Sequence, residues 1–349
     1  MAIYGSITLA NFASRALQKE AALTPKPGLV DKNNPGAHKD MDYELLVKSA
    51  KALFAGFLNL AEQAAKYTYD EARQLFVKNK SFLTLRATNI PIYPAKAFGL
   101  DPNLSLSIDY SEDNFEEELS AKDFFAMLRP IGVDAEAAML EATQGVNTHK
   151  GAFFGLGLMI SCAAALKNET SVDNICFLSA QLAQGIAEEE SANLMHLNDH
   201  ERLSLSEYNQ QRLQRLLVFL AERGRKHDPS TISAEAMGAR GLALQGYFYV
   251  RELALPFYNE LLQQGSSQQE ASLKTLLLLM AYLPDTNIIK RGGLAALKKL
   301  QTRAAEVLAE FSIAALEEFD EELIQQNLSP GGSADCLAFV YFLDNFCGF

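Results

Sequence analysis

Five polar segments that contain glycine interrupt an otherwise helical pattern, and they hold most of the residues able to do chemistry. These segments are 24–42, 145–151, 238–241, 285–293 and 329–335. Each combines residues that permit unusual backbone angles with residues able to bind a phosphate, a metal ion or a proton. The five segments are therefore the candidates for a functional site.

The segment GVNTHKG, residues 145–151, comes directly before a long apolar run. Free amide N–H groups at the start of that helix, with Lys150 beside them, would form an anion site, and Gly151 would let a ligand approach the backbone. The alternative is that Asn147 or Thr148 only caps a core helix, and that His149 is a polar group with satisfied hydrogen bonds.

The sequence HKDMD places Asp40 and Asp42 two residues apart at an expected helix start, after His38 and Lys39. Two carboxylates so close repel each other, and Mg²⁺ or a cationic group would stabilise them. The alternative is a solvated helix cap whose negative charge favours the helix dipole.

The segment 285–293 follows an apolar helix and carries Asp285 and Asn287, then Lys290 and Arg291, then two glycines. A plain turn between two helices explains the glycines, but it gives no reason for two adjacent cations.

In the last segment, SPGGSAD, Ser333 is predicted to cap the final helix. The chain contains no GxxxxGK[ST] or GxGxxG sequence, so neither a P-loop nor a Rossmann site is indicated. A GxSxG elbow, an HExxH helix and a paired-cysteine zinc pattern are also absent from the sequence.

The charge of the chain excludes some classes of function. Its 349 residues include 31 basic and 43 acidic ones, for a net charge of −12, which argues against non-specific binding to DNA or RNA. An anionic ligand must be held by local basic groups, a helix terminus or a metal ion. The four cysteines show no metal-site spacing, and the two in apolar helical runs are expected to be buried free thiols.

The N-terminal residues lack the basic start, the long apolar run and the cleavage site of a signal peptide. The most apolar run, 151–166, is shorter than the roughly 20 residues that span a bilayer, and it predicts a helix buried on all sides. We expect a cytoplasmic protein without a membrane partner, and a homo-oligomer is compatible with this sequence.

Helical periodicity dominates the chain. Helices are predicted from a cap at Ser6 towards Leu23, after a cap at Asp42, from Asp134 to Gly145 and from Ser204 to Gly224. Between residues 80 and 113 the period changes to two, which predicts a small, partly β insertion. Because no strand–helix alternation recurs and no linker divides the chain, we expect one all-α domain over 1–349 with that insertion.

Taken together and in order, the five segments resemble the triphosphoribosyl-dephospho-CoA synthase family. The similarity spans nearly the whole chain and rests mainly on two long, specific blocks, residues 20–42 and 128–158, with shorter blocks at 238–247, 285–293 and 328–338. Two positions depart from the family pattern, because Leu242 and Leu244 stand where acidic residues are usual. The family is all-α, in agreement with the periodicity.

The resemblance implies a transferase that moves the 5-triphosphoribosyl group of ATP to the 2′-hydroxyl of 3′-dephospho-CoA and releases adenine. The product is the precursor of the prosthetic group of citrate lyase or malonate decarboxylase acyl-carrier proteins. ATP and 3′-dephospho-CoA are then the partners, with Mg²⁺ as cofactor. Displacement at the anomeric carbon passes through an oxocarbenium-like state, so the site must hold a triphosphate, activate a hydroxyl and neutralise adenine.

The resemblance also implies roles for residues of these segments. The cations that could neutralise phosphates, provided that they converge, are Lys26, Lys39, Lys150, Arg240, Lys290 and Arg291. The carboxylates that could hold Mg²⁺ are Asp31, Asp40, Asp42 and Asp285, and Asp40 or Asp42 could instead be the general base. His38 or His149 could protonate adenine, since an imidazole titrates near neutral pH. The predicted substrate site is completed by Asn147, Thr148, Gly151 and Asn287.

Two other functions remain open at this point. An Mg²⁺-dependent N-ribosyl hydrolase related to ADP-ribosylglycohydrolases would use water in place of the 2′-hydroxyl. A non-catalytic nucleotide-binding homologue is suggested by Leu242 and Leu244.

Overall fold

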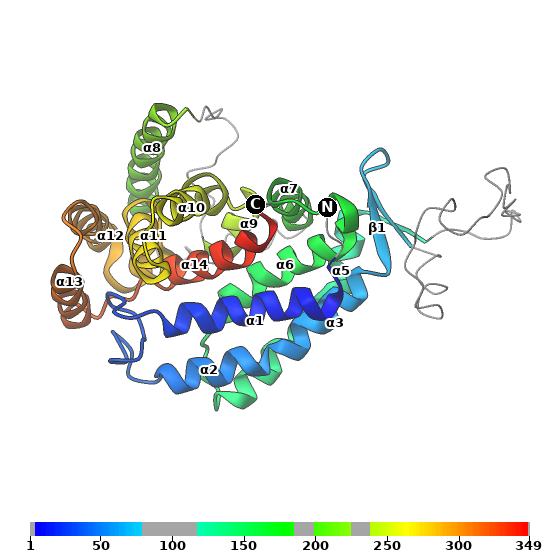
Figure 1. Ribbon diagram of the computed structural model, residues 1–349, viewed down its shortest axis with the longest axis horizontal. Coiled ribbons are helices and arrows are strands. Elements are labelled where there is room, and N and C mark those ends of the chain that lie inside the picture. Colours follow the sequence, from blue (N-terminus) through cyan, green and yellow to red (C-terminus); the bar gives the residue numbers. More distant parts are fainter. Residues whose placement is uncertain (1–3, 79–116, 185–198, 225–237, 348–349) are drawn as a thin grey trace, which may run out of the picture.

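The computed structural model describes residues 4–78, 117–184, 199–224 and 238–347, and these are mostly helical (Figure 1). The α-helices in chain order are α1 (Ser6–Ala22), α2 (Tyr43–Ala52), α3 (Phe54–Ala64), α5 (Ala121–Ala142), α6 (Lys150–Leu166), α7 (Val172–Gln184), α8 (Asp199–Glu222), α9 (Gly238–Leu244), α10 (Leu255–Gln263), α11 (Gln268–Tyr282), α12 (Thr286–Ala309), α13 (Ile313–Gln325) and α14 (Gly331–Leu343). Short helical turns are η2 (Lys167–Glu169), the π-helical η5 (Tyr249–Ala254) and η6 (Asp344–Phe346). The prediction of a mostly helical fold is confirmed.

Helices α1, α6 and α14 pack against one another in the middle of the molecule (Figure 1). Nearly every residue of α6 from Ala152 to Leu166 is buried, so the prediction of a helix buried on all sides is confirmed. By length and composition Lys150–Glu169 is apolar enough to cross a membrane, but most of it is buried inside the molecule, as in a core helix. Gly155 permits the packing, because a Cβ there would overlap the ring of Phe339 in α14.

Asp42 caps α2 as predicted, since its Oδ1 accepts a hydrogen bond of 2.8 Å from the N–H of Leu45. The helical pattern that follows is divided at Leu53, which separates α2 from α3. The apolar face nevertheless continues across this break, because its residues are all buried: Leu46, Ala50, Leu53, Phe57, Leu60 and Ala64. This face packs α3 against α1 and α6.

Two predicted serine caps are wrong. Ser6 is the first helical residue of α1, and the cap position belongs to Gly5, which has no side chain to offer a hydrogen bond. Ser204 lies inside α8, which begins at Asp199. The predicted stop of α8 at Gly224 is confirmed by its left-handed φ of 77° just after the helix end.

The start predicted at Asp134 is also wrong, because α5 begins much earlier, after Ser120. The Ser120 hydroxyl oxygen accepts a hydrogen bond of 3.2 Å from the N–H of Asp123 and caps the helix. Pro130, which usually ends a helical pattern, lies within α5. The predicted stop at Gly145 is confirmed, with φ of 88° and a 2.7 Å hydrogen bond from its N–H to the carbonyl of Leu140.

A small antiparallel sheet has the strand order β1 (Tyr67–Asp70), β2 (Leu75–Lys78), β3 (Glu118–Leu119). Phe76 of β2 is buried and stacks on Phe124 of α5 with ring centroids 3.7 Å apart, which fixes the sheet to the helical body. The prediction of a small β element in a helical fold is confirmed. The range 80–113 itself lies outside the described residues.

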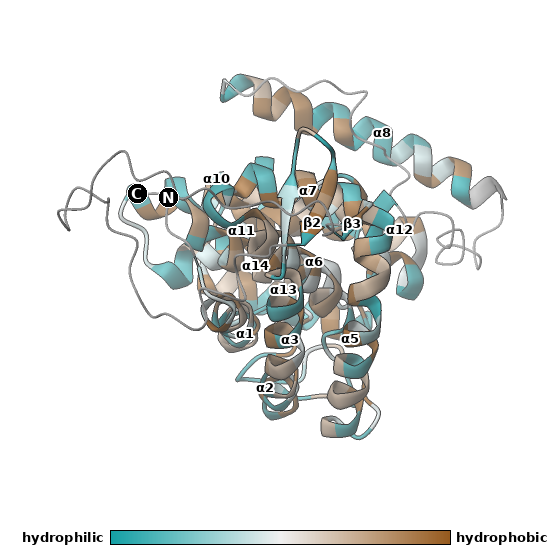
Figure 2. Ribbon diagram, turned by 90° about the vertical axis from the view of Figure 1, so that its right-hand side faces the viewer, coloured by the Kyte–Doolittle hydropathy of each residue, from teal (hydrophilic) through white to brown (hydrophobic). Residues whose placement is uncertain are grey.

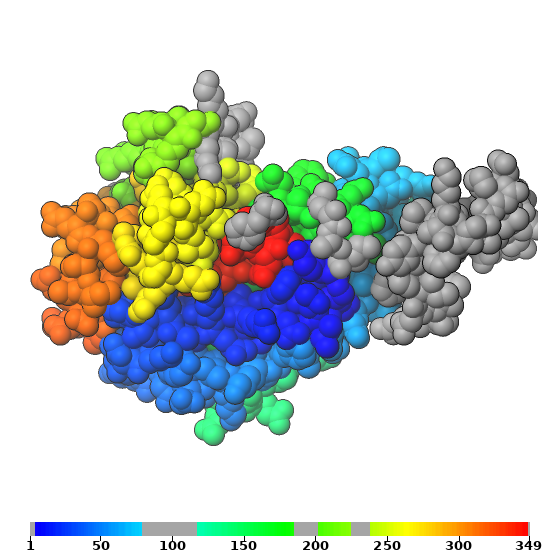
Figure 3. Space-filling view, in the orientation of Figure 1, coloured from blue at the N-terminus to red at the C-terminus, as the bar shows by residue number. Residues whose placement is uncertain are grey.

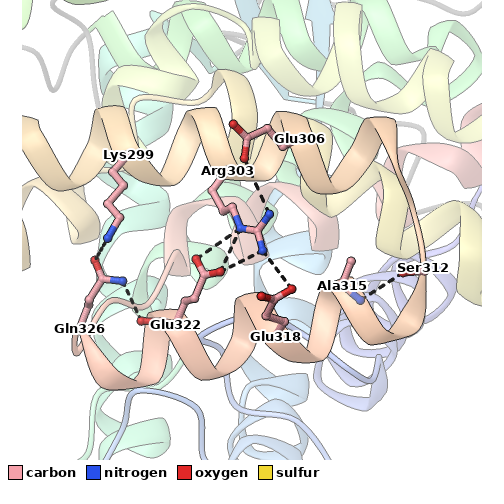
Figure 4. Close-up of polar contacts among 8 residues, drawn as sticks. All are labelled: Lys299, Arg303, Glu306, Ser312, Ala315, Glu318, Glu322 and Gln326. Atoms are coloured by element: carbon pink, nitrogen blue, oxygen red, sulfur yellow. Dashed lines mark hydrogen bonds and ion pairs between the residues drawn. The ribbon is translucent and has the colours of Figure 1, made fainter.

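Helices α12 and α13 form an antiparallel pair at one end of the molecule (Figures 1 and 4). Arg303 of α12 bridges to α13, with its Nη2 2.9 Å from Glu322 Oε1 and 3.3 Å from Glu318 Oε2. Single exposed ion pairs contribute little to stability, but a guanidinium shared by two carboxylates sets how the two helices face each other.

Helix α8 lies along one side, apart from the central helices (Figure 2). It packs through its buried face, which holds Leu205, Leu213, Leu216 and Leu220. In the space-filling view, α1 (dark blue) lies against the C-terminal α14 (red), and the rings of Tyr4 and Phe346 are 5.2 Å apart between centroids (Figure 3). The prediction of buried free thiols in helical runs is confirmed, since Cys162, Cys176 and Cys336 are all buried within helices.

Candidate active site

A cavity of about 670 Å³ opens where all five polar segments meet. Segments far apart in sequence each contribute to its lining, through Lys26 and His38, Asn147 to Gly151, Gly238 and Ala239, Asp285 to Asn287, and Ser329 to Asp335. Apolar residues such as Leu242 and Phe339 form the rest of the wall. The five segments that the sequence marks as candidates for a functional site therefore lie together around one cavity.

Three helices begin at this cavity, of which α6 and α14 are long, whereas α12 is broken soon after its start by the non-helical Gly293 (φ 70°). The first residues of α6, α12 and α14 all border it, namely Lys150 and Gly151, Thr286 and Asn287, and Gly331 and Gly332. Each helix N-terminus carries a partial positive charge and free amide N–H groups. The cavity therefore offers a local place for an anion in a chain whose net charge is −12.

The proline-rich first segment is held in shape by buried carboxylates. The backbone N–H of Lys26 donates to Asp31 Oδ2 at 2.8 Å, and the N–H of Asn33 donates to Asp31 Oδ1 at 2.7 Å. The N–H of Gly28 donates to Asp320 Oδ1 of α13 at 2.8 Å. Gly28 has a φ of 69°, and a Cβ there would press on a neighbouring backbone carbonyl. Asp31 thus organises the loop and does not border the cavity.

Lys26 borders the cavity with its charge already paired. The side chain is 1% exposed, and its Nζ donates to Glu20 Oε1 at 2.6 Å and to the Glu20 carbonyl at 2.8 Å. Breaking a buried ion pair costs about 3–5 kcal/mol, because one charge is left uncompensated. The Lys26–Glu20 ion pair therefore holds the first polar segment against the end of α1 at the cavity.

His149 is buried beside the cavity, and its two ring nitrogens have different surroundings. Its Nδ1 lies 2.8 Å from Ser49 Oγ, and Ser49 in turn accepts a hydrogen bond of 2.6 Å from the Thr148 hydroxyl. Its Nε2 is buried and, within the described ranges, has no hydrogen-bond partner. Burial, and secondarily the charge of Lys26, lowers the pKa of His149 to about 4, so the imidazole is neutral at pH 7.

His38 lies on the same wall. Its Nε2 is 2.9 Å from Ser329 Oγ, and its Nδ1 is 3.8 Å from Asp40 Oδ1. Burial lowers the pKa of His38, and the positive charge of Arg291 lowers it further, while Asp40 opposes both. Arg291 supports this loop directly, since its Nη1 donates to the carbonyl of Ala37 at 3.1 Å.

Asp285 joins the starts of α12 and α14. Its Oδ1 accepts from the N–H of Asn287 at 2.9 Å, and its Oδ2 accepts from the N–H of Ser333 at 2.9 Å and from the Ser333 hydroxyl at 3.2 Å. The prediction that Ser333 caps α14 is wrong, because Pro330 occupies the cap position and the Ser333 hydroxyl is directed to Asp285. Burial raises the pKa of Asp285, and these hydrogen bonds oppose the rise.

The predicted phosphate-binding cations are only partly brought together. Lys150 and Lys290 are exposed and line the cavity, and Lys150 also forms an ion pair with Glu136. Among the residues that the structure describes, Lys290 has no hydrogen bond or ion pair to hold it elsewhere. Arg240 lies on α9, partly buried, and is not part of the lining.

The predicted carboxylates Asp40 and Asp42 do not line the cavity. With Lys39 they border a neighbouring open hollow, which shares His38 and Met41 with it. The Asp40 side chain is 65% exposed. Over the described ranges, no three His, Cys, Asp or Glu side chains are grouped to hold a metal ion.

Several polar residues of the site were not predicted from the sequence, among them Glu20, Ser49 and Asp335. Glu20 and Ser49 lie within helical patterns, where a single polar residue on a buried face gives no sign of its role. Asp335 follows Ser333 in a segment that was interpreted as a helix start. Leu242 borders the cavity, whereas Leu244 packs against the core.

The family model described as ATP:dephospho-CoA triphosphoribosyl transferase (CitG) matches residues 6–348, and the chain belongs to this family. It is 34% identical to the 2-(5''-triphosphoribosyl)-3'-dephosphocoenzyme-A synthase of Escherichia fergusonii, over 97% of this chain and 90% of that protein. It is 32% identical to the protein of the same name in Klebsiella pneumoniae, over 95% of this chain and 88% of that one. No solved structure matches the chain. The family resemblance noted from the sequence is confirmed.

Proposed function

We propose that this cavity is the active site of a triphosphoribosyl-dephospho-CoA synthase. In it, the 5-triphosphoribosyl group of ATP would move to the 2′-hydroxyl of 3′-dephospho-CoA, with release of adenine. Membership of the family supports the reaction. The observation that supports the location is the convergence of all five polar segments, and of three helix N-termini, on one cavity.

The triphosphate is the part of the substrate that this geometry suits best. Phosphates bind at helix N-termini, where amide N–H groups and the dipole both favour negative charge. The starts of α6, α12 and α14 would supply this, and Lys290 and Lys150 would add positive charge at the edge. Such local attraction is required, because the net charge of −12 repels a polyanion at long range.

Magnesium would enter as part of the MgATP substrate. Mg²⁺ usually keeps several waters and is bound through one or two carboxylates together with substrate phosphates. The lack of a three-ligand group in the described part of the chain fits an ion carried by the triphosphate. Of the four carboxylates predicted to hold it, Asp285 borders the cavity, and its oxygens already accept hydrogen bonds from Asn287 and Ser333.

His149 would contact the substrate as an uncharged hydrogen-bonding group, for example at a purine nitrogen or a hydroxyl. With a pKa of about 4 the imidazole carries no charge at pH 7, so it adds no positive charge to a phosphate site. Its Nε2 is buried without a partner among the described residues, and a substrate hydrogen bond would relieve the cost of that desolvated nitrogen.

The reaction is tested by incubating the protein with MgATP, with and without 3′-dephospho-CoA. Adenine is measured by chromatography and the product by mass spectrometry. We expect adenine only when the acceptor is present, in an amount equal to that of the product. Adenine released without the acceptor would indicate an N-ribosyl hydrolase. ATP binding by calorimetry without any adenine would indicate a non-catalytic homologue.

A further inference from the structure

Asp335 lies near the start of α14, just after its first turn, and lines the cavity. Its carboxylate lies against the first turn of α6, at Gly151. A Cβ added to Gly151 would overlap Asp335 Oδ2, so only glycine leaves room for this approach. The starts of α6 and α14 thus bring a carboxyl group and a helix N-terminus to the same point of the wall.

Asp335 differs from the other carboxylates of the cavity because it has no hydrogen-bond or ion-pair partner among the described residues. Glu20 is paired with Lys26 at 2.6 Å, and Asp285 accepts hydrogen bonds from Asn287 and Ser333. In the described part of the chain no hydrogen bond or ion pair engages the Asp335 side chain. The Asp335 side chain is partly exposed where it borders the cavity, so its carboxyl group is open to a hydrogen bond with a substrate.

The surroundings also favour the neutral form of this carboxyl group. Burial raises the pKa of Asp335 well above its usual range, and the neighbouring Glu20 carboxylate raises it further. A carboxylic acid that keeps its proton near neutral pH is suited to general acid catalysis.

We propose, on the basis of the function proposed above, that Asp335 is a catalytic residue, the acid that protonates adenine as it leaves. The bond between the ribose C1′ and adenine N9 breaks, and its electron pair goes to the adenine. The proton of the Asp335 carboxyl group passes to a ring nitrogen of the adenine. The 2′-oxygen of the acceptor forms the new bond to C1′, and the proton released from its hydroxyl group restores Asp335 through solvent.

The test compares two ribosyl donors in Asp335→Asn, whose side chain has the same shape but no acidic proton. ATP needs a proton on its leaving group. ATP methylated at N7 does not, because its purine already carries a positive charge and departs as neutral 7-methyladenine. Glu318→Gln on α13 is a matched control, since it makes the same kind of change at an exposed site in the Arg303 network (Figure 4).

With ATP, we expect kcat of Asp335→Asn to fall by about 10²–10⁴-fold, the usual contribution of a general acid, with little change in KM. With N7-methylated ATP, the loss should be less than about tenfold. Equal losses with both donors, or no loss with ATP, would overturn the proposal. Absence of adenine release by the wild type would overturn the proposed function, and this inference with it.

A pH profile gives a second readout that a purely structural role would not produce. The wild-type kcat with ATP should fall at alkaline pH as Asp335 ionises, and this fall should be absent from the residual activity of Asp335→Asn. The other charged or titratable groups of the cavity all remain in the variant, namely Glu20, Lys26, His38, His149, Lys150, Asp285, Lys290 and Arg291. Persistence of the same alkaline fall would assign it to one of these groups and contradict the role of Asp335.

Discussion

Nδ1 of His149 lies 2.8 Å from the hydroxyl oxygen of Ser49, although the two residues are 100 positions apart in the chain. Ser49 is fully buried on α2, and His149 is the residue immediately before α6. The Thr148 hydroxyl donates to the same Ser49 oxygen at 2.6 Å. This chain of contacts holds the imidazole so that its other nitrogen stays available at the cavity.

Replacing Ser49 by alanine should therefore loosen His149. A buried polar atom left without its partner costs about 1–3 kcal/mol, and we expect this loss of stability together with a fall in kcat of about tenfold. Adenine release and urea unfolding measure the two effects. Ser14→Ala is the matched control, because Ser14 is a buried serine of α1 that donates to the Ala50 carbonyl, accepts from Gln18 and does not line the cavity. Equal activities of the two variants would contradict the positioning role.

Gly151→Ala should displace Asp335 and reduce activity. The new Cβ would overlap Asp335 Oδ2, whereas Gly132→Ala on α5 is a control in which nothing lies within 4 Å of the new Cβ. We expect at least a hundredfold loss of kcat for Gly151→Ala and none for Gly132→Ala.

A double-mutant cycle tests whether Gly151→Ala and Asp335 conflict sterically. If the overlap with Asp335 is the conflict, Gly151→Ala should lower the free energy of unfolding less in an Asp335→Ala background than in the wild type. Urea unfolding of the four proteins measures this. An equal change in the free energy of unfolding in both backgrounds would show that the added methyl group conflicts with a residue other than Asp335.

Lys290→Met should weaken ATP binding. Lys290 lies at the start of α12 on the edge of the cavity, and it forms no ion pair or hydrogen bond with any described residue. Losing a charged contact worth about 1.5 kcal/mol raises the Kd for ATP roughly tenfold. The difference in Kd between the variant and the wild type should become smaller at high salt. Calorimetry with ATP measures it. Lys299→Met on the same helix, where the lysine contacts Gln326, should bind like the wild type. Equal affinities for all three proteins would exclude Lys290 from the phosphate site.

His149 should make the folded state less stable in mild acid. Its pKa is lowered to about 4 in the folded protein from about 6.5 in the unfolded chain. Between these values the unfolded state binds the proton and the folded state does not, so stability falls as the pH drops. From pH 8 to pH 5 this contributes a loss of roughly 2 kcal/mol. Urea unfolding of His149→Gln should show a correspondingly smaller loss of stability between pH 8 and pH 5 than the wild type. A loss identical to that of the wild type would contradict the buried, neutral imidazole.

The fold could be predicted largely because its strongest signals are local. Helix α6 is apolar around its whole circumference, and such a run predicts burial without knowledge of its neighbours. The starts of helices were less predictable. Ser120 caps α5 upstream of Pro130, and a proline within a helical pattern is more often interpreted as a boundary.

The five segments could be predicted to carry the site, but the role of each side chain could not. Asp40 and Asp42 were favoured because they stand close together in sequence, yet the folded chain leaves Asp40 exposed and uses Asp42 as a helix cap. Asp335 has no distinguishing neighbour in sequence. Its position depends on Gly151, which lies far away along the chain, and contacts of this kind exist only in three dimensions.

The central claim is that ATP binds and reacts in the cavity where α6, α12 and α14 begin. Ala239→Trp tests it most directly, because Ala239 lines the cavity and an indole there would fill much of its volume. Ala295→Trp, at an exposed position of α12, is the control. Calorimetry with MgATP should show binding to the wild type and to Ala295→Trp, and none to Ala239→Trp, with all three proteins unfolding at similar temperatures. Undiminished ATP binding by a folded Ala239→Trp would contradict the account.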